Sequence, residues 1–227
     1  MGISRYARAL VTQQSGGGGG GEAGLGALTV GTPAYYSNRT NHGVAVPTAE
    51  VGDEVFIVAG HRQTGAALNL TATGFTRVAQ VVDGISCTAV FQRTIDGSED
   101  DYFIVTAGRS TYGMQTTILV SGGIGAGTID TATSYESSVT SITPPALTST
   151  APKGGFTLFF EHDNESFLTT ALPQEIERDD GTTSANYRQL INYQFVGADG
   201  TNNIPLGDLT IDGNGSIASI VWAVPIP

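Results

Sequence analysis

Cysteine is almost absent from this sequence. Cys87 is the only one among 227 residues, which excludes an internal disulfide and a zinc site built from several cysteines. The fold must therefore be held together by its core or by assembly with other chains. In the segment "ISCTAVFQR" (85–93), Ile85, Cys87, Ala89 and Phe91 alternate at strand spacing, which predicts that Cys87 is a small core residue. A reactive thiol is the alternative interpretation.

Histidine is nearly as scarce as cysteine. None of the three, His42, His61 and His162, stands beside a G-x-S-x-G nucleophile elbow, so the sequence offers no Ser-His-Asp triad. His162 lies between Glu161 and Asp163. In a strand these carboxylates face one way and the imidazole the other, which prevents a single tight metal site. We expect a protein that is not an enzyme and that needs no metal and no cofactor.

Acidic segments are the remaining candidates for chemistry. "DGSEDD" (96–101) resembles the opening of a calcium-binding loop, but Asp101 stands where the sharp-turn glycine belongs and Ala107 where the bidentate glutamate belongs. We interpret it as a polar hairpin tip. "EIERDD" (175–180) is an acidic loop in which paired carboxylates for glycoside cleavage are a weaker alternative to simple solvation. The carboxylates of "EHDNES" (161–166) leave a weak calcium site as an alternative to a strand end.

Basic residues are few. Ten Lys and Arg against 21 Asp and Glu give a formal net charge of −11. Arg5 and Arg8 are the only charged residues before Gly16, so a basic segment precedes a strongly acidic remainder. An acidic body repels phosphate backbones, and we therefore expect no nucleic-acid partner.

Long hydrophobic runs are also missing. No segment approaches the length of a membrane span, and "MGISRYARALVTQQ" lacks the apolar stretch of a secretory signal. We expect no membrane insertion and synthesis in a cytoplasm.

Residues 1–15 are predicted to form a docking arm. Their apolar members recur at helical spacing and both arginines lie off that face, which is compatible with one short amphipathic helix. A helix of this length is marginal in isolation, so the arm needs a partner surface. The docking residues are Ile3, Arg5, Tyr6, Arg8, Leu10 and Val11.

Six consecutive glycines, Gly16–Gly21, separate the arm from the rest of the chain. A Gly-rich stretch such as residues 16–26 behaves as a flexible coil, with an r.m.s. reach of roughly 20 Å. The predicted organisation is thus an arm (1–15), a tether (16–26) and a body (27–227).

The body has the signals of an antiparallel β protein. "DEVFIVAG" (53–60) is apolar on both faces, as a central strand is. Segments 75–82 and 85–93 are joined by Asp83-Gly84, which predicts a hairpin with a two-residue type I′ turn. Further strands are predicted at 101–108, 114–123, 154–162, 185–197, 206–212 and 215–225, with a long polar, proline-containing connection before residue 154.

About ten to twelve strands with such turn signals predict two packed antiparallel sheets. The fold class that we predict is all-β, an antiparallel β-sandwich with an N-terminal arm. The predicted core residues are Phe56, Val58, Cys87, Phe91, Val105, Leu158, Phe160 and Trp222.

Several short motifs follow one another in a distinctive order. They are a Val51-Gly52-Asp53 turn before an apolar strand, Gly74-Phe75, the hairpin strand Val90–Arg93, and a final strand of small residues with an aromatic one, Ile217–Val224. This order, over about residues 45–225, resembles a β-sandwich domain common in structural proteins of tailed bacteriophages. The tryptophan that is common after Gly74 in that family is replaced here by Phe75.

The resemblance implies a jelly-roll-like protein of the virion surface, assembled in the host cytoplasm, with capsid or tail subunits as partners and a homotrimer as the family's usual state. The leading hypothesis is a capsid decoration (cement) or head-fibre protein attached through its arm. A tail-fibre or receptor-binding domain that recognises a host surface glycan is the second. A carbohydrate-binding module or polysaccharide-degrading enzyme is the third. Candidate glycan contacts, for which edge packing is the alternative, are Tyr35, Tyr36, Tyr112, Tyr135 and Tyr187.

Overall fold

The computed structural model describes residues 28–32, 34–62, 69–82, 86–121, 130–142, 153–163, 186–193 and 209–223, in which it has eleven strands and no helix. Side chains are described for most of these residues up to Ser121 and for none beyond it. The strands are β1 (Leu28–Val30), β2 (Ala34–Ala45), β3 (Glu54–Arg62), β4 (Thr71–Ala72), β5 (Thr76–Val82), β6 (Ser86–Thr94), β7 (Tyr102–Val120), β8 (Asp130–Ile142), β9 (Lys153–Asp163), β10 (Asn186–Tyr193) and β11 (Leu209–Ala223).

Strand β7 organises the first sheet. It has 19 residues and is paired along both edges, with β1 and β2 along one and β3 and β4 along the other. β6 pairs with β3, and β5 pairs with β6. Every pairing is antiparallel, and the sheet does not close on itself. β3 therefore lies inside the sheet, between β6 and β7.

β2 and β7 bend together near their middles. The register skips from Arg39↔Thr111 to Asn41↔Thr106, so that extra residues of β7 bulge out of the ladder. Gly108 lies in this bulge with φ +72°, and Asn38 on β2 has φ +54°. Such left-handed values suit glycine and asparagine better than other residues. Beyond the bend, residues 41–45 of β2 pair with residues 102–106 of β7, and we call this pair the ribbon; β4 pairs with its other edge at residues 105 and 106.

The ribbon folds back over one face of the sheet, and an apolar cluster fills the space between them. Phe75 and Phe103 meet edge to face within this cluster, with ring centroids 4.8 Å apart. The buried members are Val44, Val55, Ile57, Ala59, Leu70, Ala72, Cys87, Ala89, Phe91, Ile95, Phe103, Val105, Ala107 and Leu119.

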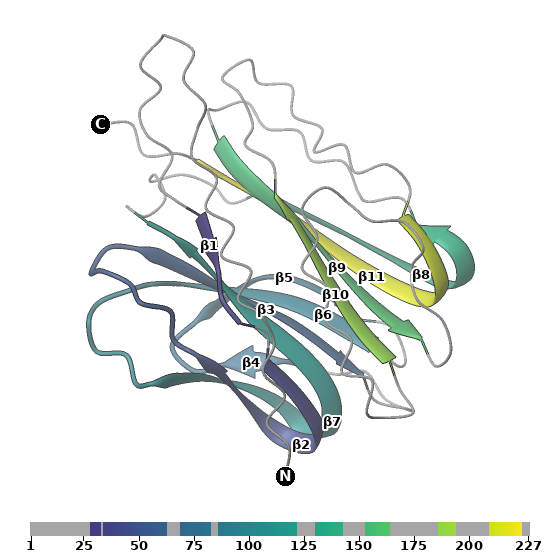
Figure 1. Cartoon of the computed structure of the whole chain (residues 1–227), viewed down its shortest axis with the longest axis horizontal. Coiled ribbons are helices and arrows are strands. Elements are labelled where there is room, and N and C mark those ends of the chain that lie inside the picture. Colours follow the sequence, from purple (N-terminus) through teal and green to yellow (C-terminus); the bar gives the residue numbers. More distant parts are fainter. Residues whose placement is uncertain are drawn as a thin grey trace, which may run out of the picture.

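The remaining strands form a second antiparallel sheet in the order β10-β9-β11-β8. It lies beside the first sheet, with β11 next to β5 and β6, and β9 next to β3 (Figure 1). Phe56, Val58 and Ile118 are completely buried but lie on the face of the first sheet away from the apolar cluster. The ribbon covers the opposite face, so both faces of this part of the sheet are buried.

These observations confirm the all-β class and the central strand. β3 is buried on both faces, as its uninterrupted apolar run predicts. The five predicted core residues with described side chains, Phe56, Val58, Cys87, Phe91 and Val105, are each buried without measurable exposure. The other three, Leu158, Phe160 and Trp222, belong to β9 and β11, whose side chains are outside the described set.

The predicted strand boundaries need correction. Segments 101–108 and 114–123 are one strand, β7, and segments 206–212 and 215–225 are one strand, β11, in each case interrupted only by register shifts. The polar residues between the predicted halves still pair through their backbones, which side-chain patterning does not reveal. Four strands were not predicted: the short β1 and β4, β2, and β8 within the proposed long connection.

The hairpin of β5 and β6 is confirmed, but its register is not the predicted one. A two-residue turn at Asp83-Gly84 would pair Val82 with Ile85, whereas Val82 pairs with Cys87. Four residues therefore separate the paired ends, and the turn itself lies outside the described residues. A shift of two residues leaves each side chain on its expected face, so Cys87 still enters the core.

Burial of Cys87 makes it a sensitive position. Burial raises the pKa of its thiol to about 12, so a neutral, unreactive thiol is expected at physiological pH. We predict that Cys87→Asp, which buries an unpaired carboxylate, lowers the free energy of unfolding by about 3–5 kcal/mol, whereas Cys87→Ala costs far less. Urea denaturation followed by circular dichroism measures both. Equal stability of the two variants would contradict the burial of this residue.

Candidate functional site

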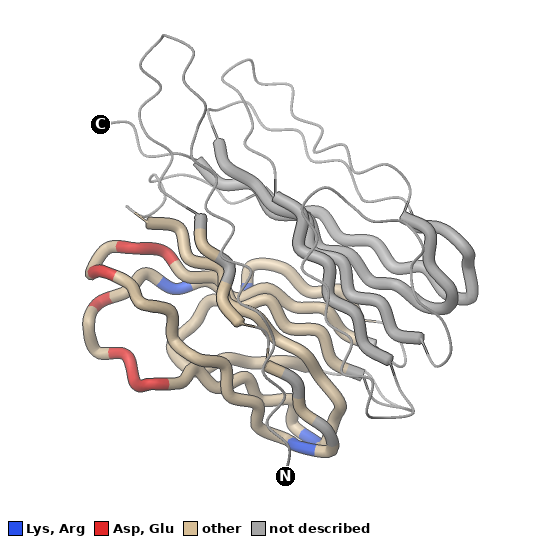
Figure 2. Tube along the Cα trace, in the orientation of Figure 1, with Lys and Arg blue, Asp and Glu red and all other residues tan. Residues whose placement is uncertain are grey.

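The negative charge of the first sheet is concentrated at one end. Every acidic side chain described there lies in or beside two loops, residues 46–53 and 95–101, and Figure 2 shows these residues gathered at the same edge of the molecule. We call this pair of loops the acidic end. The exposed members are Glu50, Asp96, Asp100 and Asp101, while Asp53 and Glu54 are buried.

Backbone hydrogen bonds hold the two loops together. Gly52 N donates to Ile95 O at 2.9 Å, and Ile95 N donates to Asp53 O at 2.8 Å. At the other side of the loops Val46 N donates to Asp101 O at 3.1 Å. The two loops therefore form one surface that is fixed to the ends of β2, β3, β6 and β7.

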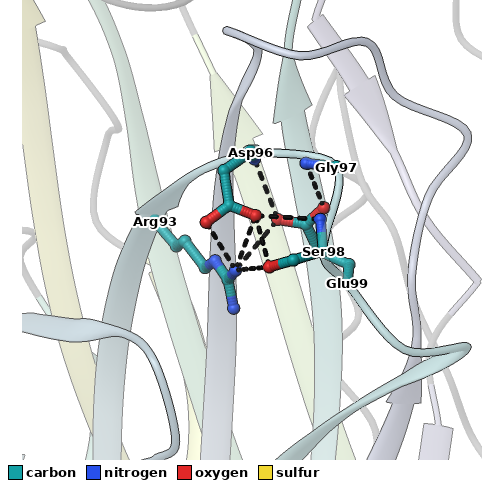
Figure 3. A network of polar contacts seen from close by, with 5 residues as sticks. All are labelled: Arg93, Asp96, Gly97, Ser98 and Glu99. Carbon is teal, nitrogen blue, oxygen red and sulfur yellow. Dashed lines mark hydrogen bonds and ion pairs between the residues drawn. The ribbon is translucent and has the colours of Figure 1, made fainter.

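Arg93 supplies the positive charge inside the 95–101 loop (Figure 3). Its Nη2 lies 3.2 Å from both carboxylate oxygens of Asp96 and 3.1 Å from Glu99 Oε1. Asp96 also accepts from the backbone and the hydroxyl of Ser98, and Glu99 accepts from the backbone of Asp96 and Gly97. The hydrogen bonds from Ser98 and the nearby Arg93 charge lower the pKa of Asp96.

The interpretation of "DGSEDD" as a polar hairpin tip is correct in the polar loop but wrong in the hairpin, because β3 lies between β6 and β7 and the loop crosses from one to the other. A guanidinium and backbone amides occupy the carboxylates of Asp96 and Glu99. Within the part of the chain whose side chains are described, no group of three or more His, Cys, Asp or Glu side chains could hold a metal ion.

The chain enters the first sheet at this same end. β1 begins at Leu28, which pairs with Val120, and Val120 pairs on its other edge with Glu54. Glu54 directly follows the 46–53 loop. The predicted tether, residues 16–26, therefore joins the body beside the acidic end.

The ribbon extends from the acidic end and exposes apolar side chains on its outer face. Tyr102 is 59% exposed and Ile104 is 40% exposed, and Tyr102 directly follows Asp100 and Asp101 in the chain. A Cβ atom at Gly43 of β2 would lie 3.7 Å from each of these two side chains, so they flank the glycine. The outer face is thus a shallow apolar surface with two carboxylates at its end.

A second polar group is buried under the ribbon. The rings of His42 and His61 meet edge to face with centroids 4.4 Å apart, and Thr111 Oγ1 lies 3.0 Å from His42 Nε2 and 3.1 Å from His61 Nδ1. His42 Nε2 is 2.9 Å from the carbonyl oxygen of Arg39, so it carries the proton and donates. A Cβ at residue 113 would lie 2.9 Å from the His61 ring, which explains the glycine there.

Burial keeps both imidazoles neutral. It lowers the pKa of His61 to about 3, with a smaller lowering from the neighbouring His42, and burial also lowers the pKa of His42. His42 Nδ1, His61 Nε2 and the side-chain amide of Gln115 are buried without a hydrogen-bond partner among the described residues. Sequence reasoning treated the two histidines separately, and no signal in the sequence brings them together.

Two of the predicted glycan contacts, Tyr36 and Tyr112, have described side chains, and these two do not share a face of the sheet. Tyr36 is half buried, with its hydroxyl donating to Gly43 O, whereas Tyr112 on β7 is 40% exposed. Tyr36 pairs with Gly113, so Tyr112 belongs to the opposite face of the sheet. The side chain of Tyr35 is outside the described set, as are those of Tyr135 on β8 and Tyr187 on β10.

Other predicted sites are placed only in part. Glu161, His162 and Asp163 are the last residues of β9, which agrees with a strand end. The docking residues of the arm, Ile3, Arg5, Tyr6, Arg8, Leu10 and Val11, and the loop 175–180 lie outside the described residues.

Comparison with known proteins gives no relative: no protein-family model, curated protein or solved structure matches the chain. Among the residues that the structure describes, no helix is long and apolar enough to cross a membrane.

The neutral histidine pair predicts a stability that depends on pH. An unfolded histidine titrates near 6.5, and folded His61 near 3. The contribution of neutral His61 to the free energy of unfolding is therefore complete above pH 6.5. It is lost as the pH falls toward 3, by at most about 1.4 kcal/mol per pH unit. Urea midpoints of the wild type and His61→Gln between pH 7 and about 4.5 measure this slope. Identical slopes for the two proteins would show that His61 is not held neutral.

The pairing of Arg93 with the 95–101 loop predicts that calcium does not change the thermal stability of the protein. Since Arg93 already balances Asp96 and Glu99, added calcium or EDTA should leave the melting temperature unchanged. Differential scanning fluorimetry in both conditions is the measurement. A melting temperature that rises with calcium concentration would restore the calcium-loop interpretation.

Proposed function

We propose that the chain is a non-enzymatic structural protein of a tailed-phage virion, a capsid decoration (cement) or head-fibre protein held on the particle by residues 1–15. The observation that carries this proposal is the order of parts in the sequence. A basic amphipathic segment and a run of glycines precede an all-β body whose motifs resemble those of phage β-sandwich proteins.

The fold supports the proposal that the body is a jelly-roll-like β-sandwich. Both faces of β3 are buried, one against the ribbon and one toward the second sheet. A body of this kind gives a rigid mass on a particle surface. The entry of the tether at the end of the sheet leaves the arm able to reach a neighbouring subunit.

The polar groups of the first sheet support a structural role. The Arg93 network joins neighbours in one loop, and the His42–His61 pair is buried under the ribbon. A hydrolytic site needs a nucleophile and a base that a substrate can reach. Neither group meets that requirement.

A receptor-binding role on a tail fibre is the second candidate. The outer face of the ribbon favours it, because Tyr102 is 59% exposed there, and an exposed aromatic ring is a surface on which a sugar ring stacks. Glycan-array binding by the isolated body, lost in Tyr102→Ala, would favour this role over a purely structural one.

Removal of the arm tests the leading proposal. A variant without residues 1–26 should fold cooperatively but no longer cosediment with particles of the phage that encodes the chain. Tyr6→Asp with Leu10→Asp should reproduce the loss, because charges in the apolar face prevent its burial. Replacement of the six glycines by a Gly/Ser mixture of equal length is the matched control and should bind normally. Full occupancy of particles by the truncated body would refute attachment through the arm.

A further inference from the structure

The ribbon's outer face and the acidic end form one continuous surface suited to a basic, amphipathic segment. Tyr102 and Ile104 expose apolar area beside Gly43, and Asp100 and Asp101 are the last two residues of the loop that leads into their strand. Val46 N donates to the backbone carbonyl Asp101 O at 3.1 Å, which ties the backbone that carries these aspartates to the end of the ribbon. The described arginine nearest in sequence, Arg93, is engaged by Asp96 and Glu99 instead.

The chain itself carries a segment of the complementary chemistry. Residues 1–15 contain two arginines and no acidic residue, together with apolar residues at helical spacing. The surface offers an apolar floor with a negative edge, and the arm offers an apolar face with positive flanks. No other segment of the sequence combines these features.

Connectivity brings the arm to its own surface. The predicted tether meets β1 at Leu28, in the row of Val120 and Glu54, beside the loops that lead to Asp101. The 11-residue tether (16–26) spans at most about 40 Å and gives a tethered group an effective concentration of about 1 mM. An arm with an intrinsic affinity of only about 0.1 mM would then be docked roughly ten times out of eleven.

We propose that the arm of an unattached chain docks in cis on the ribbon's outer face, with its apolar residues on Tyr102 and Ile104 and its arginines at Asp100 and Asp101. At micromolar protein the intramolecular contact outcompetes the same contact with a second copy by about a thousandfold. The arm is then masked until a stronger receiving surface replaces the ribbon.

The docking of the arm on the ribbon does not depend on the proposed function. Its regulatory role rests on the proposed function, because it requires that the same arm attaches the protein to a particle. If the same arm attaches the protein to a particle, self-docking reduces the apparent affinity for the particle by the undocked fraction. The ribbon would thereby prevent premature association between soluble chains.

Trypsin reports directly on the docked arm, because Arg5 and Arg8 are its only cleavage sites before the glycines. Mass spectrometry of the purified full chain measures the rate at which residues 1–8 are lost. We expect cleavage about tenfold slower than in Tyr102→Ala, at a rate independent of protein concentration, and accelerated by salt at about 0.5 M. Tyr112→Ala, an exposed tyrosine of the same strand off the ribbon, is the matched control and should remain protected.

A second variant covers the case in which Tyr102→Ala fails to fold. Asp100→Asn with Asp101→Asn removes the negative edge, adds no trypsin site and keeps the backbone hydrogen bond from Val46. It should lose protection in the same way. Fast cleavage of the wild type, protection that grows with protein concentration, or protection unchanged in both variants would each overturn the proposal.

Particle binding separates this inference from the proposed function. Tyr102→Ala should bind particles more tightly than the wild type, whereas Tyr6→Asp with Leu10→Asp should lose both protection and binding. Protection of the arm without any particle binding would refute the attachment proposal and leave self-docking intact. Particle binding through an arm that trypsin cleaves rapidly would refute self-docking alone.

Discussion

The double pairing of β7 is the constraint on which the rest of the first sheet depends. Its 19 residues reach from the outer ribbon to the interior of the sheet, and four other strands find their register on it. A strand of this length spans roughly 60 Å when straight, too long for one compact layer. The bulge at Gly108, opposite the left-handed Asn38, turns that length into two layers with the apolar cluster between them.

Polar groups occupy two different environments in this arrangement. One is the buried space between the ribbon and the sheet, and the other is the pair of loops at the end of the sheet. Under the ribbon, burial forces two imidazoles into the neutral state, with a glycine at 113 making room for one of them. At the loops, Asp96 and Glu99 organise themselves around Arg93. The described acidic residues are therefore concentrated where the chain enters the sheet. The acidic end is therefore a surface of negative charge whose two loops are held together by backbone hydrogen bonds.

The sequence predicted what depends on side-chain periodicity and missed what depends on backbone pairing. The run Val55–Ala59 indicated a central strand because both of its faces are apolar, and alternation around Cys87 placed that residue in the core. β2 was not predicted, because "AYYSNRTNHGVA" has little apolar alternation. Its backbone nevertheless pairs with β7 along most of its length. The pairing of His42 with His61 depends on the bend at Asn38 and Gly108, and no local pattern encodes such a contact between distant residues. The acidic end was visible only as separate loops until the fold placed them together.

The shortness of β1 has a mechanical consequence. A pull on the arm enters the body at Leu28 and is borne first by the three pairs that join β1 to β7. The hydrogen bond from Gly31 N to Thr117 O follows, and only then does the load reach the twelve residues of β2. Release of residues 28–33 lengthens the connection by about 20 Å at the rise of an extended chain. The first strand thus acts as an extensible link that gives way under tension before the apolar core is loaded.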